Sequence, residues 1–236
     1  MEKFFIRNNE SAPADKIVEQ AEEKNTQMNQ EQRDSHIMEM EKKIYEELIS
    51  DVNMPPIDVI HTAMVKNGLK PSAWHRWVLQ GVDYPLGVYG NDPDKYEEAL
   101  KKLQVAFRRE HLSKDPSGGE EVYDGDDFFV GKNEEMVNEL MQAVHNNDEV
   151  KMGELLGYPR SSTEYLMKRK FDRTISRDIP ETPSDQIDFE IAGFAPSKDH
   201  YKEELAFAKE QSNQIRTIIP EIVDAFEVKR VKRGLL

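Results

Sequence analysis

Apolar residues recur every three or four positions between residues 37 and 65, and this spacing predicts two consecutive helices. The first stripe is formed by Ile37, Met40, Ile44, Leu48 and Val52. Such spacing places side chains on one face of an α-helix. Pro55 and Pro56 end the first pattern, and the second stripe then contains Ile57, Ile60, Met64 and Val65.

The rest of the chain predicts more helix and little β-structure. Asp92 or Asp94 can cap a helix with a face formed by Tyr96, Leu100, Leu103 and Phe107. Residues 127–131 and 189–194 are the two strand candidates. Further helices are expected after Asn133, over residues 150–156, from Ser161 or Ser162 to about 171, after Ser197 and before Phe226. The fold class expected is mainly α, an irregular helical domain with one short two-stranded β element.

Turn residues and charge runs divide the chain into four predicted regions. Residues 1–35 are rich in Glu, Gln, Asn and Lys and predict a flexible or partner-ordered arm. Residues 36–113 form a helical region with an aromatic segment, and residues 114–119 (Lys-Asp-Pro-Ser-Gly-Gly) form a linker. Residues 120–228 are expected to form a compact C-terminal domain, followed by a basic tail over residues 229–236.

Composition excludes several classes of function. The 236 residues carry a net charge of -14, which disfavours broad binding to nucleic acid or to anionic membrane. The absence of cysteine excludes disulfides, thiolate-held Fe–S clusters and cysteine-ligated zinc. No apolar run is long enough to span a membrane, and residues 1–7 are too short and acidic for a signal peptide. We therefore expect a cytoplasmic or virion-associated protein.

The most informative stretch is the Gly-Tyr-Pro-Arg-Ser-Ser run at residues 157–162, which places hydroxyls at a predicted helix start. Ser161 and Glu164 have the spacing of a capping box, in which a hydroxyl and a carboxylate satisfy backbone N–H groups. Ser197 is likewise interpreted as the cap of a later helix. The run lacks the glycine-flanked serine of a nucleophile elbow.

This region resembles an uncharacterised, mainly archaeal family, domain of unknown function 483. The similar positions are Phe129-Val130-Gly131-Lys132, then Gly153, Leu155-Leu156-Gly157-Tyr158-Pro159, and downstream Ala206, Ala208 and Ile218-Ile219-Pro220-Glu221. The match covers residues 128–226. Members of that family carry a cysteine pair where this chain has Ser161 and Ser162, and a later cysteine where it has Ser197. Another thiol position would fall near His200 or Tyr201.

The resemblance implies that this chain has lost a thiol or metal function. Cysteines at two helix starts could bind a soft metal, whereas serines keep the caps and remove the soft ligand. The family supplies no established activity. We expect a non-enzymatic protein that binds a protein partner or assembles as a homo-oligomer, with no cofactor. The alternative is a hydrolase- or transferase-like enzyme with a remnant site formed by Ser161, Ser162, Glu164, Ser197, Asp199 and His200.

Three other groups of residues are candidates for binding. Partner contact is predicted for Trp74, Arg76, Trp77, Tyr84 and Tyr89, because Trp, Tyr and Arg dominate binding hot spots. The alternative for these five residues is a local core.

The C-terminal tail and an acidic loop complete the candidates. Nucleic acid or an acidic partner could contact the cations of the tail, Lys229, Arg230, Lys232 and Arg233. A hard cation could bind Asp124, Asp126 and Asp127, although a solvated acidic loop is the simpler interpretation. The six histidines show no metal-ligand spacing.

Overall fold

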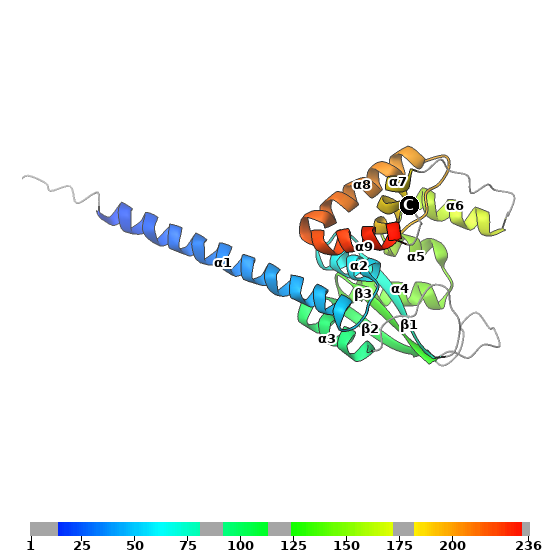
Figure 1. Cartoon of the computed structure of the whole chain (residues 1–236), viewed down its shortest axis with the longest axis horizontal. Coiled ribbons are helices and arrows are strands. Elements are labelled where there is room, and N and C mark those ends of the chain that lie inside the picture. Colours follow the sequence, from blue (N-terminus) through cyan, green and yellow to red (C-terminus); the bar gives the residue numbers. More distant parts are fainter. Residues whose placement is uncertain (1–13, 81–91, 113–123, 172–181, 233–236) are drawn as a thin grey trace, which may run out of the picture. The chain divides into compact units, whose positions relative to one another are not determined.

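The computed structural model describes residues 14–80, 92–112, 124–171 and 182–232. The chain divides by its contacts into two units, residues 1–43 and 44–236. The first unit contains most of helix α1 (Ala14–Ser50). The second contains the last two turns of α1, from Ile44, and all the other described elements (Figure 1).

Eight helices and three strands follow α1 in the part of the chain that the structure describes. In chain order they are α2 (Pro56–Lys66), β1 (Ser72–Gln80), α3 (Pro93–Leu103), β2 (Ala106–Leu112), β3 (Asp124–Gly131), α4 (Glu134–His145), α5 (Glu149–Leu155), α6 (Arg160–Phe171), α7 (Pro183–Ala192), α8 (Tyr201–Ile218) and α9 (Pro220–Lys232). The prediction of a mainly α protein with a short β element is confirmed. The β element contains a third strand.

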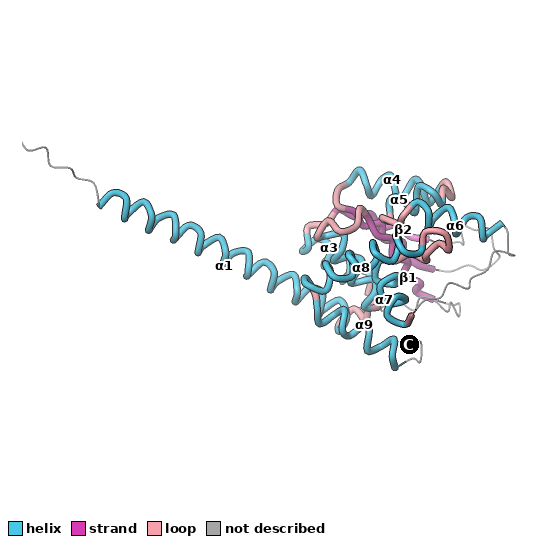
Figure 2. The backbone as a smooth tube through the Cα atoms, turned by 90° about the horizontal axis from the view of Figure 1, so that it is seen from above, coloured by secondary structure: helices cyan, strands magenta, loops and turns pink. Residues whose placement is uncertain are grey.

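The strands form an antiparallel sheet in the order β1-β3-β2, with both faces covered. Side chains alternate along a strand, so Phe128 and Val130 face one way and Phe129 the other. The first two join the main core with the end of α1 and with α2, α3 and α9, whereas Phe129 packs against α4 and α5. Figure 2 shows the strands between α4 and α5 on one side and α7, α8 and α9 on the other.

The sheet joins two regions that the sequence pattern separates. β1 and β2 precede the predicted linker at residues 114–119, and both pair with β3 beyond it. The contacts instead divide the chain between Lys43 and Ile44. β3 contains the strand expected at residues 127–131. Phe107, expected on the face of a helix, lies in β2, because α3 ends at Leu103 and Gln104 has a left-handed φ of 55°.

The prediction of a strand at residues 189–194 is wrong, because residues 183–192 form α7. Thr182 and Asp185 make a reciprocal capping box and Pro183 occupies the first turn, so three local signals start a helix here. The expected caps at Asp92 and Asn133 are confirmed, because each side chain accepts a hydrogen bond from the backbone N–H three residues on.

Candidate functional site

The Gly-Tyr-Pro turn at residues 157–159 connects α5 to α6 and packs against the segment between α2 and β1. Gly157 has a φ of 76°, and a Cβ there would lie 2.9 Å from Pro71 Cδ. The ring of Tyr158 lies against Lys70, with its centroid 5.0 Å from Nζ. Glycine is therefore needed at 157 both for the left-handed conformation and for the close approach, and the turn fixes the start of α6.

The first turn of α6 uses both of its serine hydroxyls to reach residues near the start of α8. Ser162 Oγ donates a hydrogen bond to the backbone oxygen of Ala195 at 2.6 Å. Ser161 Oγ donates to Oε1 of Glu204 at 2.5 Å. Ser162 is buried and Ser161 is partly exposed. Two helix starts that are remote in sequence therefore meet.

Glu204 is the centre of this meeting point. Its Oε1 also accepts a hydrogen bond from Ser197 Oγ at 2.8 Å, and its Oε2 accepts one from the Ser197 backbone N–H at 2.5 Å. Ser197 and Glu204 are each only 2% exposed. We call Ser161, Ser197 and Glu204 the serine–glutamate cluster. Three donors compensate the burial of this carboxylate, and hydrogen bonds to a charged group are stronger than neutral ones.

Neither predicted serine cap is the N-cap of its helix. The N-cap of α8 is His200, with no side-chain cap bond, so the prediction that Ser197 caps this helix is wrong. Ser197 Oγ accepts a hydrogen bond from the His200 N–H in the turn before the helix. The capping box predicted for Ser161 and Glu164 is wrong. Helix α6 begins at Arg160, Ser161 bonds to Glu204, and Glu164 pairs with Arg160 at 2.8 Å.

Only some of the residues of the predicted remnant site come together. Ser161 and Ser197 share one carboxylate oxygen, and Ser162 bonds to Ala195, two residues before Ser197. Asp199 and His200 are exposed. In the described part of the chain, neither side chain contacts the serine–glutamate cluster, and only the backbone N–H of His200 bonds to Ser197.

Sequence reasoning overlooked Glu204. The available signal was its position on the apolar face of α8, in register with Ala208, Gln211 and Ile215, all of which are buried. A glutamate on such a face needs donors from elsewhere in the fold.

A buried lysine and a partly buried histidine lie at the C-terminal end of α7. Lys70 Nζ donates to the Ala192 backbone oxygen at 3.2 Å, and His61 Nε2 donates to the Ile191 oxygen at 3.1 Å. Both therefore satisfy carbonyls that the helix end leaves free. Burial lowers the pKa of Lys70 from 10.5 to about 7. Burial, followed by the charges of Lys70 and His75, holds the pKa of His61 well below 6.5.

A second polar network lies inside the main core. His75 Nδ1 lies 3.2 Å from Oδ1 of Asp58 and His75 Nε2 lies 3.3 Å from Thr62 Oγ1. Thr62 Oγ1 in turn lies 3.0 Å from the Tyr96 hydroxyl, whose pKa is raised by burial. The order carboxylate, imidazole, hydroxyl is that of a catalytic triad. The hydroxyl of this set is fully buried, so these residues hold α2, β1 and α3 together.

Of the described residues of the predicted aromatic binding surface, Trp77 lies in the core, and Trp74 and Arg76 are partly exposed. Trp77 is 1% exposed and stacks on Tyr96, so it offers no surface to a partner. Trp74 stacks on Phe129 with centroids 6.2 Å apart, and Arg76 lies over Trp74. The other two predicted contacts, Tyr84 and Tyr89, lie outside the described residues.

The acidic residues proposed for a hard cation do not converge. Asp126 and Asp127 point to opposite faces of the sheet, because successive side chains of a strand alternate. Asp126 pairs with Arg109 at 2.8 Å and Asp127 with Arg76 at 2.8 Å. The side chain of Asp124 lies outside the described residues. Across the described ranges no group of three or more His, Asp or Glu residues could hold a metal ion.

The predicted basic tail is partly helical. Lys229 and Arg230 belong to α9, and Arg230 forms an ion pair with Glu190 of α7. Lys229 is exposed. The side chain of Lys232 and the whole of Arg233 lie outside the described residues.

No family model, curated protein or solved structure matches this chain. The resemblance to domain of unknown function 483 therefore stays a prediction. Within the described ranges, every helix is too short or too polar to cross a membrane.

Proposed function

We propose that this chain is a non-enzymatic protein-interaction protein, assembling or regulating a partner through its helical scaffold, with α1 as the binding element. The observation that carries this proposal is a cluster of exposed apolar side chains on α1. Ile37, Met38 and Met40 expose 52%, 64% and 51% of their surfaces. Grouped exposed apolar residues mark interaction sites.

The burial and the pairing of the candidate polar groups support a binding function over a catalytic one. Glu204 accepts three hydrogen bonds, and both Ser162 and Ser197 are buried. Asp126 and Asp127 are each paired with an arginine. Groups saturated in this way hold elements together, because a reacting group needs access to its substrate.

An affinity capture experiment tests the proposal. The full chain is immobilised and exposed to host extract, with and without nuclease, next to an Ile37→Glu variant and a Val228→Glu variant. Val228 is a matched control, because it is also 52% exposed and also helical. We expect wild type and Val228→Glu to retain the same protein and Ile37→Glu to lose it. Equal capture by all three would contradict binding through α1.

We further propose that the serine–glutamate cluster is the vacated thiol site implied by the resemblance. Ser161 and Ser197, which align with cysteines, both bond to the same oxygen of Glu204. In a Ser161→Cys/Ser197→Cys variant, two thiolates would therefore lie close enough to share a soft metal. Co²⁺ titration should give a thiolate-to-metal absorption band in this variant and none in wild type. A variant that folds and shows no band contradicts the vacancy.

The convergence of the two serines also favours the alternative function, a hydrolase-like enzyme. Ser161 is partly exposed, and its hydroxyl donates to a carboxylate that could accept its proton. The chain should then hydrolyse p-nitrophenyl acetate, and Ser161→Ala should abolish the reaction. Hydrolysis that is absent, or unchanged in Ser161→Ala, excludes this alternative.

A further inference from the structure

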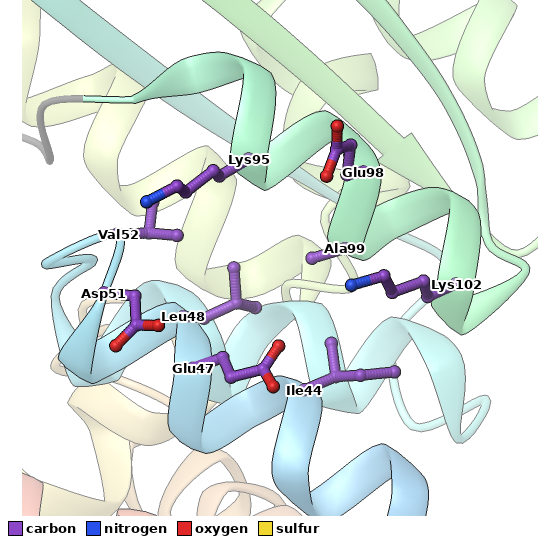
Figure 3. Close-up of a pocket in the computed structure, with 9 residues that line it drawn as sticks. All are labelled: Ile44, Glu47, Leu48, Asp51, Val52, Lys95, Glu98, Ala99 and Lys102. Carbon is purple, nitrogen blue, oxygen red and sulfur yellow. The ribbon is translucent and has the colours of Figure 1, made fainter.

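A groove lies between the end of α1 and helix α3, entirely within the second unit of the chain. Its apolar floor is formed by Ile44, Leu48, Val52 and Ala99. Figure 3 shows these side chains between the two helices, with Lys95, Glu98 and Lys102 on the α3 side and Glu47 and Asp51 on the α1 side. The cavity measures about 250 Å³, which is below the roughly 300–1,000 Å³ typical of small-molecule sites. This size suits one or two apolar side chains of a protein.

The two walls of the groove differ in charge. The wall formed by α1 and the following turn carries Glu47 and Asp51. The wall formed by α3 carries Lys95 and Lys102, with Glu98 between them. A helix that fits this groove needs an apolar centre, acidic residues on the side facing α3 and basic residues on the opposite side.

Residues 34–43 of α1 have this pattern. Successive residues of a helix are rotated by about 100°, so Ile37 and Met40 lie side by side. Asp34 and Glu41 lie seven positions apart on one flank of that pair. On the other flank Lys43 carries the positive charge and also forms an exposed ion pair with Glu39 at 3.7 Å. The chain therefore contains both a groove with one acidic and one basic wall and a helical segment with the matching flanks.

We infer that the groove binds residues 34–43 of a second copy of this chain. The inference rests on the proposed function, since it names the partner of the exposed α1 residues. Ile37 and Met40 of one protomer occupy the apolar floor of its partner. Asp34 and Glu41 lie against the α3 lysines, and Lys43 lies against the acidic wall. In a two-fold dimer the same contact forms twice, which closes the assembly.

Sedimentation velocity of the full chain over a range of concentrations tests this inference. We expect concentration-dependent dimerisation of wild type, the same behaviour in Val228→Glu, and dimerisation at least tenfold weaker in Ile37→Glu. Circular dichroism verifies that each variant is folded, and both substitutions replace a side chain that is half exposed. Equal dimerisation of Ile37→Glu and Val228→Glu overturns the inference.

Exchanging the charges of α3 and of residues 34–43 tests whether the groove is the binding site for this segment. One variant carries Lys95→Glu and Lys102→Glu, and the other carries Asp34→Lys and Glu41→Lys. Each alone should dimerise at least tenfold more weakly than wild type, because like charges meet in both copies of the contact. A mixture of the two should dimerise more tightly than either alone, since every contact in the mixed dimer again joins opposite charges. Absence of this rescue overturns the inference.

The two proposals fail separately. If wild type is a monomer at all concentrations while Ile37→Glu still loses the captured protein, the second-copy inference is wrong and the proposed function stands. If wild type is a monomer and capture is equal in all variants, both are wrong.

Discussion

At the scale of single residues, the most constrained group is the carboxylate of Glu204. It is buried with three donors, two of them from Ser197 and one from Ser161, which is 43 residues away in sequence. Removing the carboxylate would leave those donors without an acceptor, and such loss costs more than the bonds contribute. The sequence placed Ser161 and Ser197 near helix starts. It did not indicate the acceptor that they share, because nothing near Glu204 in the chain indicates which donors reach it.

Lys70 leads to a prediction about pH. Its pKa is about 7 in the folded protein and 10.5 when solvated, so between these values the unfolded chain binds a proton that the native protein does not. The free energy of unfolding should therefore rise as pH increases from 7 to about 10, by up to about 1.4 kcal/mol per pH unit. Below pH 7 Lys70 does not make the free energy of unfolding depend on pH, because it is protonated in both the folded and the unfolded chain.

Urea unfolding at pH 7 and pH 9 measures this effect. Lys70→Met keeps the length of the buried side chain and should remove most of the rise. Lys198→Met, a change at an exposed lysine, should leave the rise intact. An unchanged rise in Lys70→Met would show that other groups cause it.

At the scale of elements, local signals and tertiary packing disagree in one region and agree in others. The apolar run from Phe189 to Phe194 has the appearance of a strand, and yet Thr182, Pro183 and Asp185 start a helix before it. Two of the three strands were not expected, because β1 mixes its two tryptophans with polar residues and three of the seven residues of β2 are charged. Their pairing with β3 buries Trp77 and places Arg76 and Arg109 beside Asp127 and Asp126. β3 itself was predicted from its apolar centre.

The packing of α5 against α6 gives a prediction at this scale. A Cβ added at Gly153 would overlap Thr163 Oγ1 and lie 2.7 Å from its Cγ2. Gly153→Ala should therefore lower the free energy of unfolding by about 1–3 kcal/mol, although alanine favours helix. Chemical denaturation measures the change.

A double-mutant cycle attributes that loss to the contact. Thr163→Ala removes the two atoms that a Cβ at residue 153 would overlap. The double variant should therefore be about 1 kcal/mol more stable than the sum of the two single effects. Additive effects would mean that the cost arises elsewhere in α5.

At the scale of the whole molecule, α1 belongs to two units. Its side chains at residues 32–40 are exposed, whereas Ile44, Tyr45 and Leu48 are buried in the main core. A chain that begins at Ser35 should therefore retain the urea midpoint of the full chain. A chain that begins at Asn53 lacks these three buried side chains and should be strongly destabilised or unfolded, since each contributes about 2–5 kcal/mol.

Leu48→Ala in the full chain is the matched measurement for this prediction. It should lower the free energy of unfolding by about 2–5 kcal/mol without removing any of the preceding residues. A lowered midpoint in the chain that begins at Ser35 would show that the exposed part of α1 also stabilises the fold.

The sequence by itself determined the mainly α class, the cap at Asn133, a cap at Asp92 or Asp94, the strand at the centre of the sheet and the absence of thiol chemistry. These properties depend on residues within one or two helical turns of each other, or on composition alone. The tertiary structure decided the pairing of β1 and β2 with β3, the burial of Trp77 and the meeting of Ser161 with Ser197 at Glu204. Those contacts join residues far apart in the chain. They form only where two surfaces lose water together, and the pattern along one segment does not record its partner.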